Sequence, residues 1–186
     1  MFNRLIRWVV SSSPRFWVKV LYHDIWTLRK VVHNARKEEK IPVSCQRKGW
    51  KYKLYTLYWE SYGSFIGVDA VLGDRISFPH KPLGIFISNW THVGNNCVIY
   101  QQVTIGSNLL KDSKGYGAPY VEDGVYIGCG AKIIGNVHVG KNARIGANCV
   151  VVKDVPDNSV SFIRGIETIV KDETLNNVNK PISQRY

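Results

Sequence analysis

The sequence lacks the features that mark a membrane-spanning, secreted or zinc-binding protein. No apolar run approaches the roughly 18 residues of a membrane-spanning helix. The apolar patch in residues 1–13 is interrupted by Arg4 and Arg7, so it is too short for the apolar core of a secretory signal. The four cysteines show no CxxC or Cys/His ligand spacing. We therefore expect a cytoplasmic protein with reduced thiols and no metal site.

Acidic residues are scarce in the first third of the chain. The 186 residues fit one domain with a short extension, and residues 1–60 hold 13 Lys and Arg against 4 Asp and Glu. Five of the six tryptophans lie there too. Such a segment can contact nucleic acid, a membrane surface or an acidic glycan, or it can pack as a helical layer with a solvated basic face. Because no helix-turn-helix, RNP or KH signature is present, we expect no nucleic-acid partner.

A six-residue repeat organises the rest of the sequence. Large apolar residues fall six apart within three groups: Ile66, Leu72 and Phe78; Ile87, Val93, Ile99 and Ile105; Val121, Ile127, Ile133, Val139, Ile145 and Val151. This period fits neither the 3.6 residues of a helical turn nor a simple two-residue alternation. It fits short strands joined by turns, three to a triangular coil of about 18 residues, stacked around one apolar column. The sequence predicts a mainly β fold, a parallel β-helix.

The repeat breaks twice, and breaks in such a column often mark function. The step from Phe78 to Ile87 is nine residues, and the step from Ile105 to Val121 is sixteen. The second break ejects a loop, and a loop of this length tends to be a lid or an interface arm. The expected organisation has four parts: a basic, aromatic helical segment at 1–61, a β-helix at 62–170, the extruded loop at 107–120 and a polar tail at 171–186.

Counting coils brings several polar or turn residues to one corner of the column. Two residues after positions on the third face lie His80, Gln101, Cys129 and Ala147. Cys129 and Ala147 differ by one full coil, so their peptide groups should stack on the same edge. We expect the functional site at this corner.

Three stretches carry a family resemblance. They are VGNNCVIYQQVTIG at 93–106, DGVYIGCGAKIIGNVHVGKNARIGANCVVVKDVPDNSV at 123–160, and the turn around His80. They resemble the hexapeptide-repeat acyltransferases, most closely the branch of serine acetyltransferases and bacterial polysaccharide O-acetyltransferases. The resemblance covers residues 62 to about 160. It implies a left-handed coil, a homotrimer, acetyl-CoA as donor and active sites in clefts between subunits.

His80 matches the position of the family's general base. Imidazole, whose unperturbed pKa is near 6.5, can accept the proton of an attacking hydroxyl at neutral pH. The alternative is an ordinary surface histidine in a proline-rich turn. His92 and His138 fall at turn positions of regular coils, where we expect solvated or packed side chains.

The resemblance also implies where the donor binds. It places the pantetheine arm of acetyl-CoA along turn peptides equivalent to Cys129 and Ala147, and the expected cofactor-binding residues are Cys129, Ala147, Lys153, Gly130 and Gln101. Lys153, together with Arg164, could reach the CoA phosphates, and Lys132 is an alternative; each lysine could instead lie on a solvated face. Gln101 either lines the cleft or forms a ladder with its neighbours.

The chain departs from the serine acetyltransferase pattern at several positions. Phe65 stands where the family has the aspartate that orients the catalytic histidine, and Gly117-Ala118 replaces an Arg-His pair. Pro79 replaces the aspartate just before that histidine. A backbone carbonyl or another carboxylate must then hold the imidazole. The candidate carboxylates are Asp69, Asp74 and Glu60.

These departures shape the leading hypothesis, because free serine would lose charged partners for its ammonium and carboxylate groups. We expect an acetyl-CoA-dependent O-acetyltransferase acting on a sugar hydroxyl of a bacterial surface polysaccharide or its precursor. The basic N-terminal segment would contact the acceptor or the inner face of the membrane. The alternatives are a serine O-acetyltransferase, an amino-sugar N-acetyltransferase, or a non-catalytic β-helix scaffold that binds an anionic surface.

Overall fold

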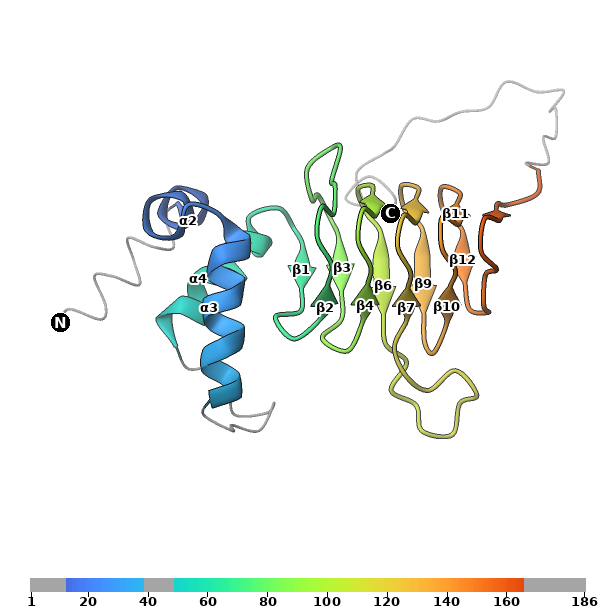
Figure 1. Ribbon diagram of the computed structural model, residues 1–186, viewed down its shortest axis with the longest axis horizontal. Coiled ribbons are helices and arrows are strands. Elements are labelled where there is room, and N and C mark those ends of the chain that lie inside the picture. Colours follow the sequence, from blue (N-terminus) through green and yellow to red (C-terminus); the bar gives the residue numbers. More distant parts are fainter. Residues whose placement is uncertain (1–12, 39–48, 166–186) are drawn as a thin grey trace, which may run out of the picture.

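The computed structural model describes residues 13–38 and 49–165. A group of helices forms one end of an elongated molecule, and stacked coils of short strands form the rest (Figure 1). The helices are α2 (Pro14–Tyr22), α3 (Ile25–Glu38) and α4 (Trp50–Glu60). The fold is mainly β with an N-terminal α-helical segment, as the sequence predicts. The polar tail expected at 171–186 lies outside the described residues.

The helical layer has its own apolar core and joins the β-helix through aromatic side chains. Each helix contributes a fully buried residue: Val18, Leu28 and Leu54. Trp26 of α3 stacks on Phe78 of the first coil, with ring centroids 6.4 Å apart. The hydroxyl of Tyr55 in α4 donates a 2.8 Å hydrogen bond to the carbonyl of Ile66. These contacts fix the layer on the first coil of the column.

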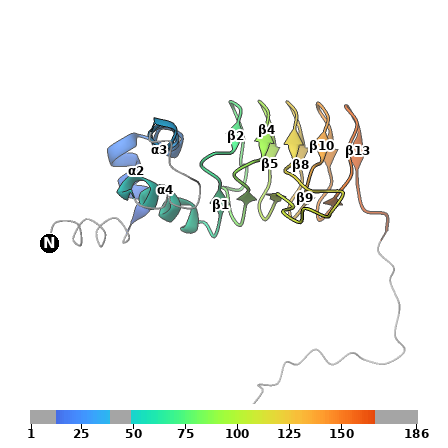
Figure 2. The same cartoon turned by 90° about the horizontal axis from the view of Figure 1, so that it is seen from below.

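The strands form three parallel sheets, one for each side of the column (Figure 2). The first sheet contains β1 (Phe65–Ile66), β3 (Phe86–Ile87), β6 (Thr104–Gly106), β9 (Lys132–Ile134) and β12 (Val150–Val151). The second contains β2 (Val71–Leu72), β4 (His92–Val93), β7 (Tyr120–Val121) and β10 (His138–Val139). The third contains β5 (Val98–Ile99), β8 (Tyr126–Ile127), β11 (Arg144–Ile145) and β13 (Val160–Ser161).

The six-residue repeat forms the apolar core inside these sheets. In the first sheet the inward residues lie in register and are fully buried: Ile66, Ile87, Ile105 and Ile133. The coils approach one another closely at the turns. At Gly128, for example, an added Cβ would lie 2.7 Å from the backbone nitrogen of Ala147, so a larger residue would push the coils apart.

The loop at 107–120 leaves the column between β6 and β7 and projects away from it (Figure 1). At its base, Asn108 and Gly117 exchange two backbone hydrogen bonds of 2.8 and 2.9 Å. Farther out, Leu109 and Leu110 are 61% and 67% exposed. The loop is therefore anchored at its base and presents apolar side chains away from the column.

The described residues contain no candidate for a membrane-spanning helix or for a metal centre. Within 13–38 and 49–165, no helix is both long and apolar enough to cross a bilayer. In the same ranges no three His, Cys, Asp or Glu side chains gather as a group able to hold a metal ion.

Cys97 and Cys149 are buried free thiols on the inside of the column. Burial raises the pKa of the Cys97 thiol.

Candidate active site

The third and first sheets meet at a corner that we call the site edge. Its members are His80, Gln101, Cys129 and Ala147. Backbone hydrogen bonds connect the successive coils there: Gly130 N–H donates to the carbonyl of Gln101 at 3.0 Å, and Asn148 N–H donates to that of Cys129 at 2.8 Å. The coil count from the sequence thus places these residues together, one coil above the next.

His80 is held by a side chain of the neighbouring coil. Its Nδ1 lies 3.0 Å from Oε1 of Gln101. Because an amide oxygen only accepts hydrogen bonds, Nδ1 carries the proton in this contact and Nε2 keeps its lone pair. The His80 side chain is exposed, so Nε2 is accessible from outside the chain. This is the arrangement that a general base requires.

The partner of His80 is an amide and not one of the carboxylates considered from the sequence. Asp69 lies near a different histidine, with Oδ1 3.6 Å from Nδ1 of His33. The backbone N–H of Asp74 donates to the side chain of Asn95. Phe65, at the position of the family's orienting aspartate, is 37% exposed and pairs in register with Phe86 on the outside of the first sheet.

One tyrosine packs against His80 and a second packs against the first; the repeat pattern singled out neither. The ring of Tyr100 meets the imidazole edge-on, with centroids 5.2 Å apart and planes at 89°. Tyr126 lies on the far side of Tyr100, with centroids 5.2 Å apart. A side-chain hydrogen bond with Tyr100 raises the pKa of Tyr126. The sequence does contain a pattern that indicates them: Tyr100 follows the inward Ile99 and Tyr126 precedes the inward Ile127. Both tyrosines therefore point outward from the third sheet.

A lysine ammonium lies at the same edge. Lys132 donates hydrogen bonds to the carbonyls of Gln102 at 2.9 Å and Gly130 at 2.7 Å. The ammonium therefore bridges two coils of the site edge. From the sequence, Lys132 is an alternative contact for the CoA phosphates. Although Lys132 lies on strand β9, its ammonium reaches the turns next to Gln101 and Cys129.

Lys153 lies at the C-terminal end of the column, beside a pocket of about 280 Å³. The pocket is lined by residues 149–153 and 161–163. Because Gly146 N–H donates to the carbonyl of Ser161 at 2.7 Å, Phe162 lies one coil beyond Ala147. The pocket therefore continues the site edge past Ala147. Arg164 is exposed near the last described residue.

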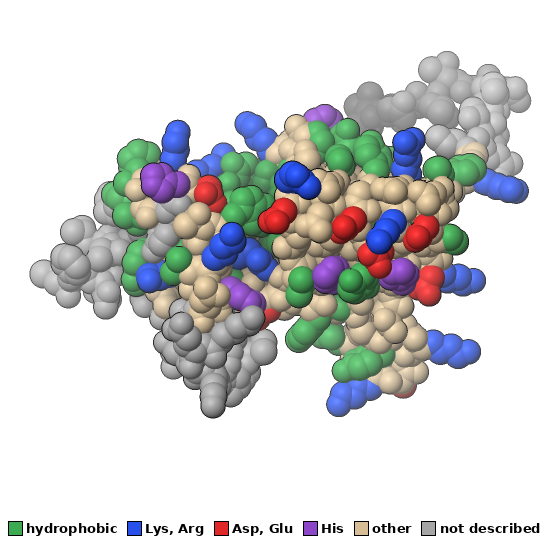
Figure 3. Space-filling model, in the orientation of Figure 1, with side chains coloured by type: hydrophobic (Ala, Val, Ile, Leu, Met, Phe, Trp, Pro, Cys, Tyr) green, Lys and Arg blue, Asp and Glu red, His purple; other side chains and the backbone are tan. Residues whose placement is uncertain are grey.

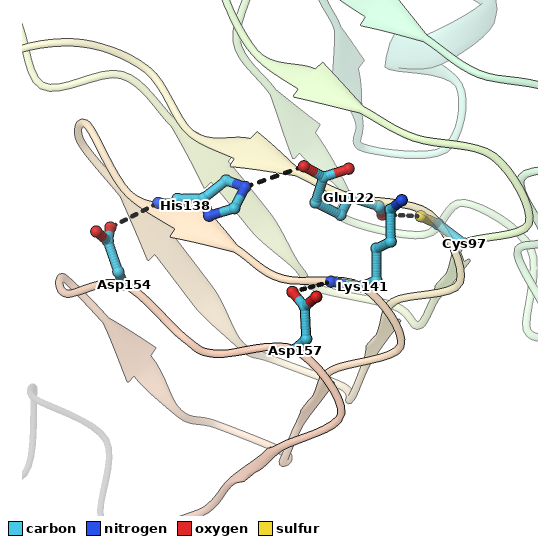
Figure 4. A network of polar contacts seen from close by, with 6 residues as sticks. All are labelled: Cys97, Glu122, His138, Lys141, Asp154 and Asp157. Carbon is cyan, nitrogen blue, oxygen red and sulfur yellow. Dashed lines mark hydrogen bonds and ion pairs between the residues drawn. The ribbon is translucent and has the colours of Figure 1, made fainter.

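The remaining β-helix histidines belong to a different face. His92 and His138 lie on strands β4 and β10 of the second sheet, so their expected turn positions were wrong. Tyr120 stacks on His92 with centroids 4.1 Å apart. His138 Nε2 lies 3.1 Å from a carboxylate oxygen of Glu122 (Figure 4). These side chains are packed and paired, which agrees with their expected structural role.

Comparison with known families agrees with this geometry. The family described as bacterial transferase hexapeptide (six repeats) matches residues 118–153. Residues 118–153 thus carry the repeat of the hexapeptide transferases. Its three-sided column is a left-handed parallel β-helix, as the resemblance implies.

The similar proteins within this family are serine acetyltransferases. That of Bacillus pumilus (strain SAFR-032) is 34% identical over 133 residues, which cover 66% of this chain and 60% of that protein. The structure of Neisseria gonorrhoeae serine acetyltransferase in complex with serine has a TM-score of 0.61 and 29% identity, covering 80% of this chain and 58% of that one. A serine acetyltransferase complex with CoA has a TM-score of 0.59 and 31% identity, covering 73% and 52%.

These comparisons correct the leading hypothesis from the sequence. The relatives are consistently serine acetyltransferases, so they contradict the assignment to a sugar hydroxyl and to polysaccharide biosynthesis. The missing Arg-His pair and aspartates argued against serine, but the overall similarity is to serine acetyltransferases despite these differences. The chain spans about half the length of the relatives that it matches.

Proposed function

We propose that this hexapeptide-repeat protein is an acetyltransferase that moves the acetyl group of acetyl-CoA to the hydroxyl of serine. The observation that carries the proposal is His80, with Nδ1 on Gln101 and Nε2 accessible at one end of a continuous edge of turn peptides. Similarity to serine acetyltransferases, one solved with CoA and another with serine, supports the same chemistry.

The reaction follows from the two nitrogens of His80. Nε2 accepts the hydroxyl proton while the serine oxygen forms a bond to the thioester carbonyl carbon. The tetrahedral intermediate then collapses as its C–S bond breaks, and the proton on Nε2 passes to the departing sulfur. Exposed turn amides of the site edge can donate to the oxyanion. Direct transfer needs no covalent enzyme intermediate, so Cys129 acts through its backbone and not as a nucleophile.

The length and ends of the site edge support the placement of acetyl-CoA. His80 and Ala147 are three coils apart, or about 14 Å at the spacing of neighbouring strands. The pocket beside Lys153 lies one coil farther on. We assign the thioester to the His80 end, the pantetheine arm to the Gln101, Cys129 and Gly130 peptides, and the phosphates to Lys153. The ammonium of Lys132 adds positive charge midway along this path.

We further propose that the active unit is a homotrimer. His80 is exposed on the single chain, and the outward Phe65 and Phe86 beside the site edge are 37% and 48% exposed. Val150 extends the same side of the column and is 67% exposed. Contact with a neighbouring copy would cover these apolar side chains and close the cleft around the imidazole.

An assay of thiol release from acetyl-CoA tests the proposed function. With L-serine we expect turnover and formation of O-acetylserine, identified by mass spectrometry. His80→Ala should lower kcat by roughly 100-fold or more, because general base catalysis contributes about that much. His92→Ala, a histidine on the second sheet, serves as the matched control and should retain activity. Acetylation of a 4-amino sugar but not of serine, or full activity in His80→Ala, would contradict the proposal.

A surface of the helical layer supports a membrane contact in addition to catalysis. Phe16 and Val20 of α2 are one helical turn apart and are 56% and 55% exposed, and Lys19 lies between them in the chain. Figure 3 shows hydrophobic side chains beside Lys and Arg side chains at the helical end of the molecule. We propose that this end lies on an anionic lipid surface, because cationic and apolar side chains on one helix face favour that environment.

A further inference from the structure

A neutral side chain orients His80, although the family pattern has a carboxylate in that role. The ungapped alignment of the His80 turn puts Phe65 at the aspartate position, and a phenyl ring cannot accept a hydrogen bond from Nδ1. The contact at Nδ1 is instead the amide oxygen of Gln101, 3.0 Å away. The group that contacts Nδ1 is therefore an uncharged amide, and it lies on the next coil.

The backbone around Gln101 is fixed by the β-helix. Its carbonyl accepts a hydrogen bond from Gly130 N–H at 3.0 Å, one coil farther along. Its neighbour Tyr100 packs edge-on against His80 and lies against the ring of Tyr126, with the two tyrosine centroids 5.2 Å apart. Gln101 itself is half-buried. An amide held in this way can keep the imidazole in one orientation.

We propose that Gln101 is the positioning residue of His80, which selects the tautomer with the proton on Nδ1 and supports catalysis without a negative charge. The proposal rests on the proposed acetyl transfer. It gives the Gln101 side chain this role, whereas the sequence placed Gln101 only with the donor-binding residues. A carboxylate at this place would stabilise the imidazolium strongly, whereas an amide stabilises it only through its dipole.

This role predicts different effects for two substitutions: one on kcat and one on the pH dependence. Gln101→Ala removes the acceptor, so kcat should fall about tenfold, the loss of one hydrogen bond, with little change in the KM for acetyl-CoA. Gln101→Glu places a carboxylate next to the ring and favours its protonated form. The active form of a general base is the neutral one, so activity is lost as pH falls. The acid limb of the pH–rate profile should therefore move upward by about one pH unit.

The next residue provides a matched control. Gln102 is exposed, and its backbone has a φ of 62°, so the chain turns between the two glutamines. Gln102→Glu adds the same charge one residue away from the contact. We expect this variant to leave both kcat and the acid limb close to those of the native protein. If Gln102→Glu shifted the limb as far as Gln101→Glu, the specific contact would be disproved.

An NMR titration separates this inference from the proposed function, because it requires no substrate. The Cε1 proton of His80, assigned by its absence in His80→Ala, reports the protonation of the ring. A midpoint that rises in Gln101→Glu and not in Gln102→Glu supports the contact even if serine is not acetylated. An unchanged midpoint in Gln101→Glu overturns the positioning role even if the native protein acetylates serine.

Discussion

Tyr100 shows how a single side chain supports the candidate base. Its ring contacts His80 edge-on, and it also packs against the ring of Tyr126 in the next coil, with centroids 5.2 Å apart. An edge-to-face contact with an aromatic ring is worth about 0.5–1.5 kcal/mol beyond the area that it buries. Tyr100 therefore limits rotation of the imidazole in a direction that the Gln101 hydrogen bond does not control.

Two variants of Tyr100 separate its ring from its hydroxyl. Tyr100→Phe keeps the ring against His80 and should retain kcat within about twofold. Tyr100→Ala removes the ring and should lower kcat by about five- to tenfold, the equivalent of one aromatic contact. Steady-state assays with acetyl-CoA and serine measure both. Equal losses in the two variants would indicate that the hydroxyl, and not the ring, supports the base.

The site was partly predictable from individual residues. The coil count brought His80, Gln101, Cys129 and Ala147 to one corner because each lies two residues after an inward position of the third face. It could not predict the His80–Gln101 hydrogen bond, because the count places residues on a corner but does not give the directions of their side chains. The search for an orienting group also considered only carboxylates and backbone carbonyls, so a side-chain amide was overlooked.

Among the elements, the strands were the most predictable. Their inward residues recur every six positions, and a two-residue strand followed by a turn satisfies this period directly. Where the period breaks, the prediction was less complete. The sequence predicts an extruded loop at 107–120. It does not predict how the base of the loop closes, because Asn108 and Gly117 are joined there by backbone hydrogen bonds, which no side-chain pattern encodes. The packing of the helices on the column could not be predicted either, because it depends on aromatic contacts between residues far apart in the sequence, such as Trp26 and Phe78.

The column predicts a large cost for truncating one inward side chain. Ile133 of β9 is fully buried between β6 and β12 in the first sheet. Ile133→Ala should lower the free energy of unfolding by about 2–5 kcal/mol, since it leaves a cavity. Val71→Ala, on the outside of β2 and 56% exposed, is the control and should change it by less than about 0.5 kcal/mol. Urea denaturation measures both, and similar small effects would argue against a tightly packed column.

For the whole molecule, the main feature is the separation of two surfaces along its length. The helical layer occupies one end, and the site edge runs along the β-helix away from it (Figure 1). The second sheet presents acidic, basic and histidine side chains interspersed on its outer face (Figure 3), which is a poor match for an anionic surface. A contact of the basic, apolar helical end with a membrane would therefore leave the site edge open to acetyl-CoA and serine.

Vesicle co-sedimentation tests that contact with a closely matched pair of variants. Val20 of α2 is 55% exposed and Val71 of β2 is 56% exposed, so Val20→Ser and Val71→Ser remove the same side chain at equal exposure. We expect the native protein to bind phosphatidylglycerol vesicles more tightly than phosphatidylcholine vesicles, and less tightly as salt rises. Val20→Ser should weaken binding by roughly tenfold, the value of one inserted valine, whereas Val71→Ser should bind like the native protein. Equal binding to both lipids, or equal loss in the two variants, would leave the exposed face of α2 without a role at the membrane and would favour a protein partner there instead.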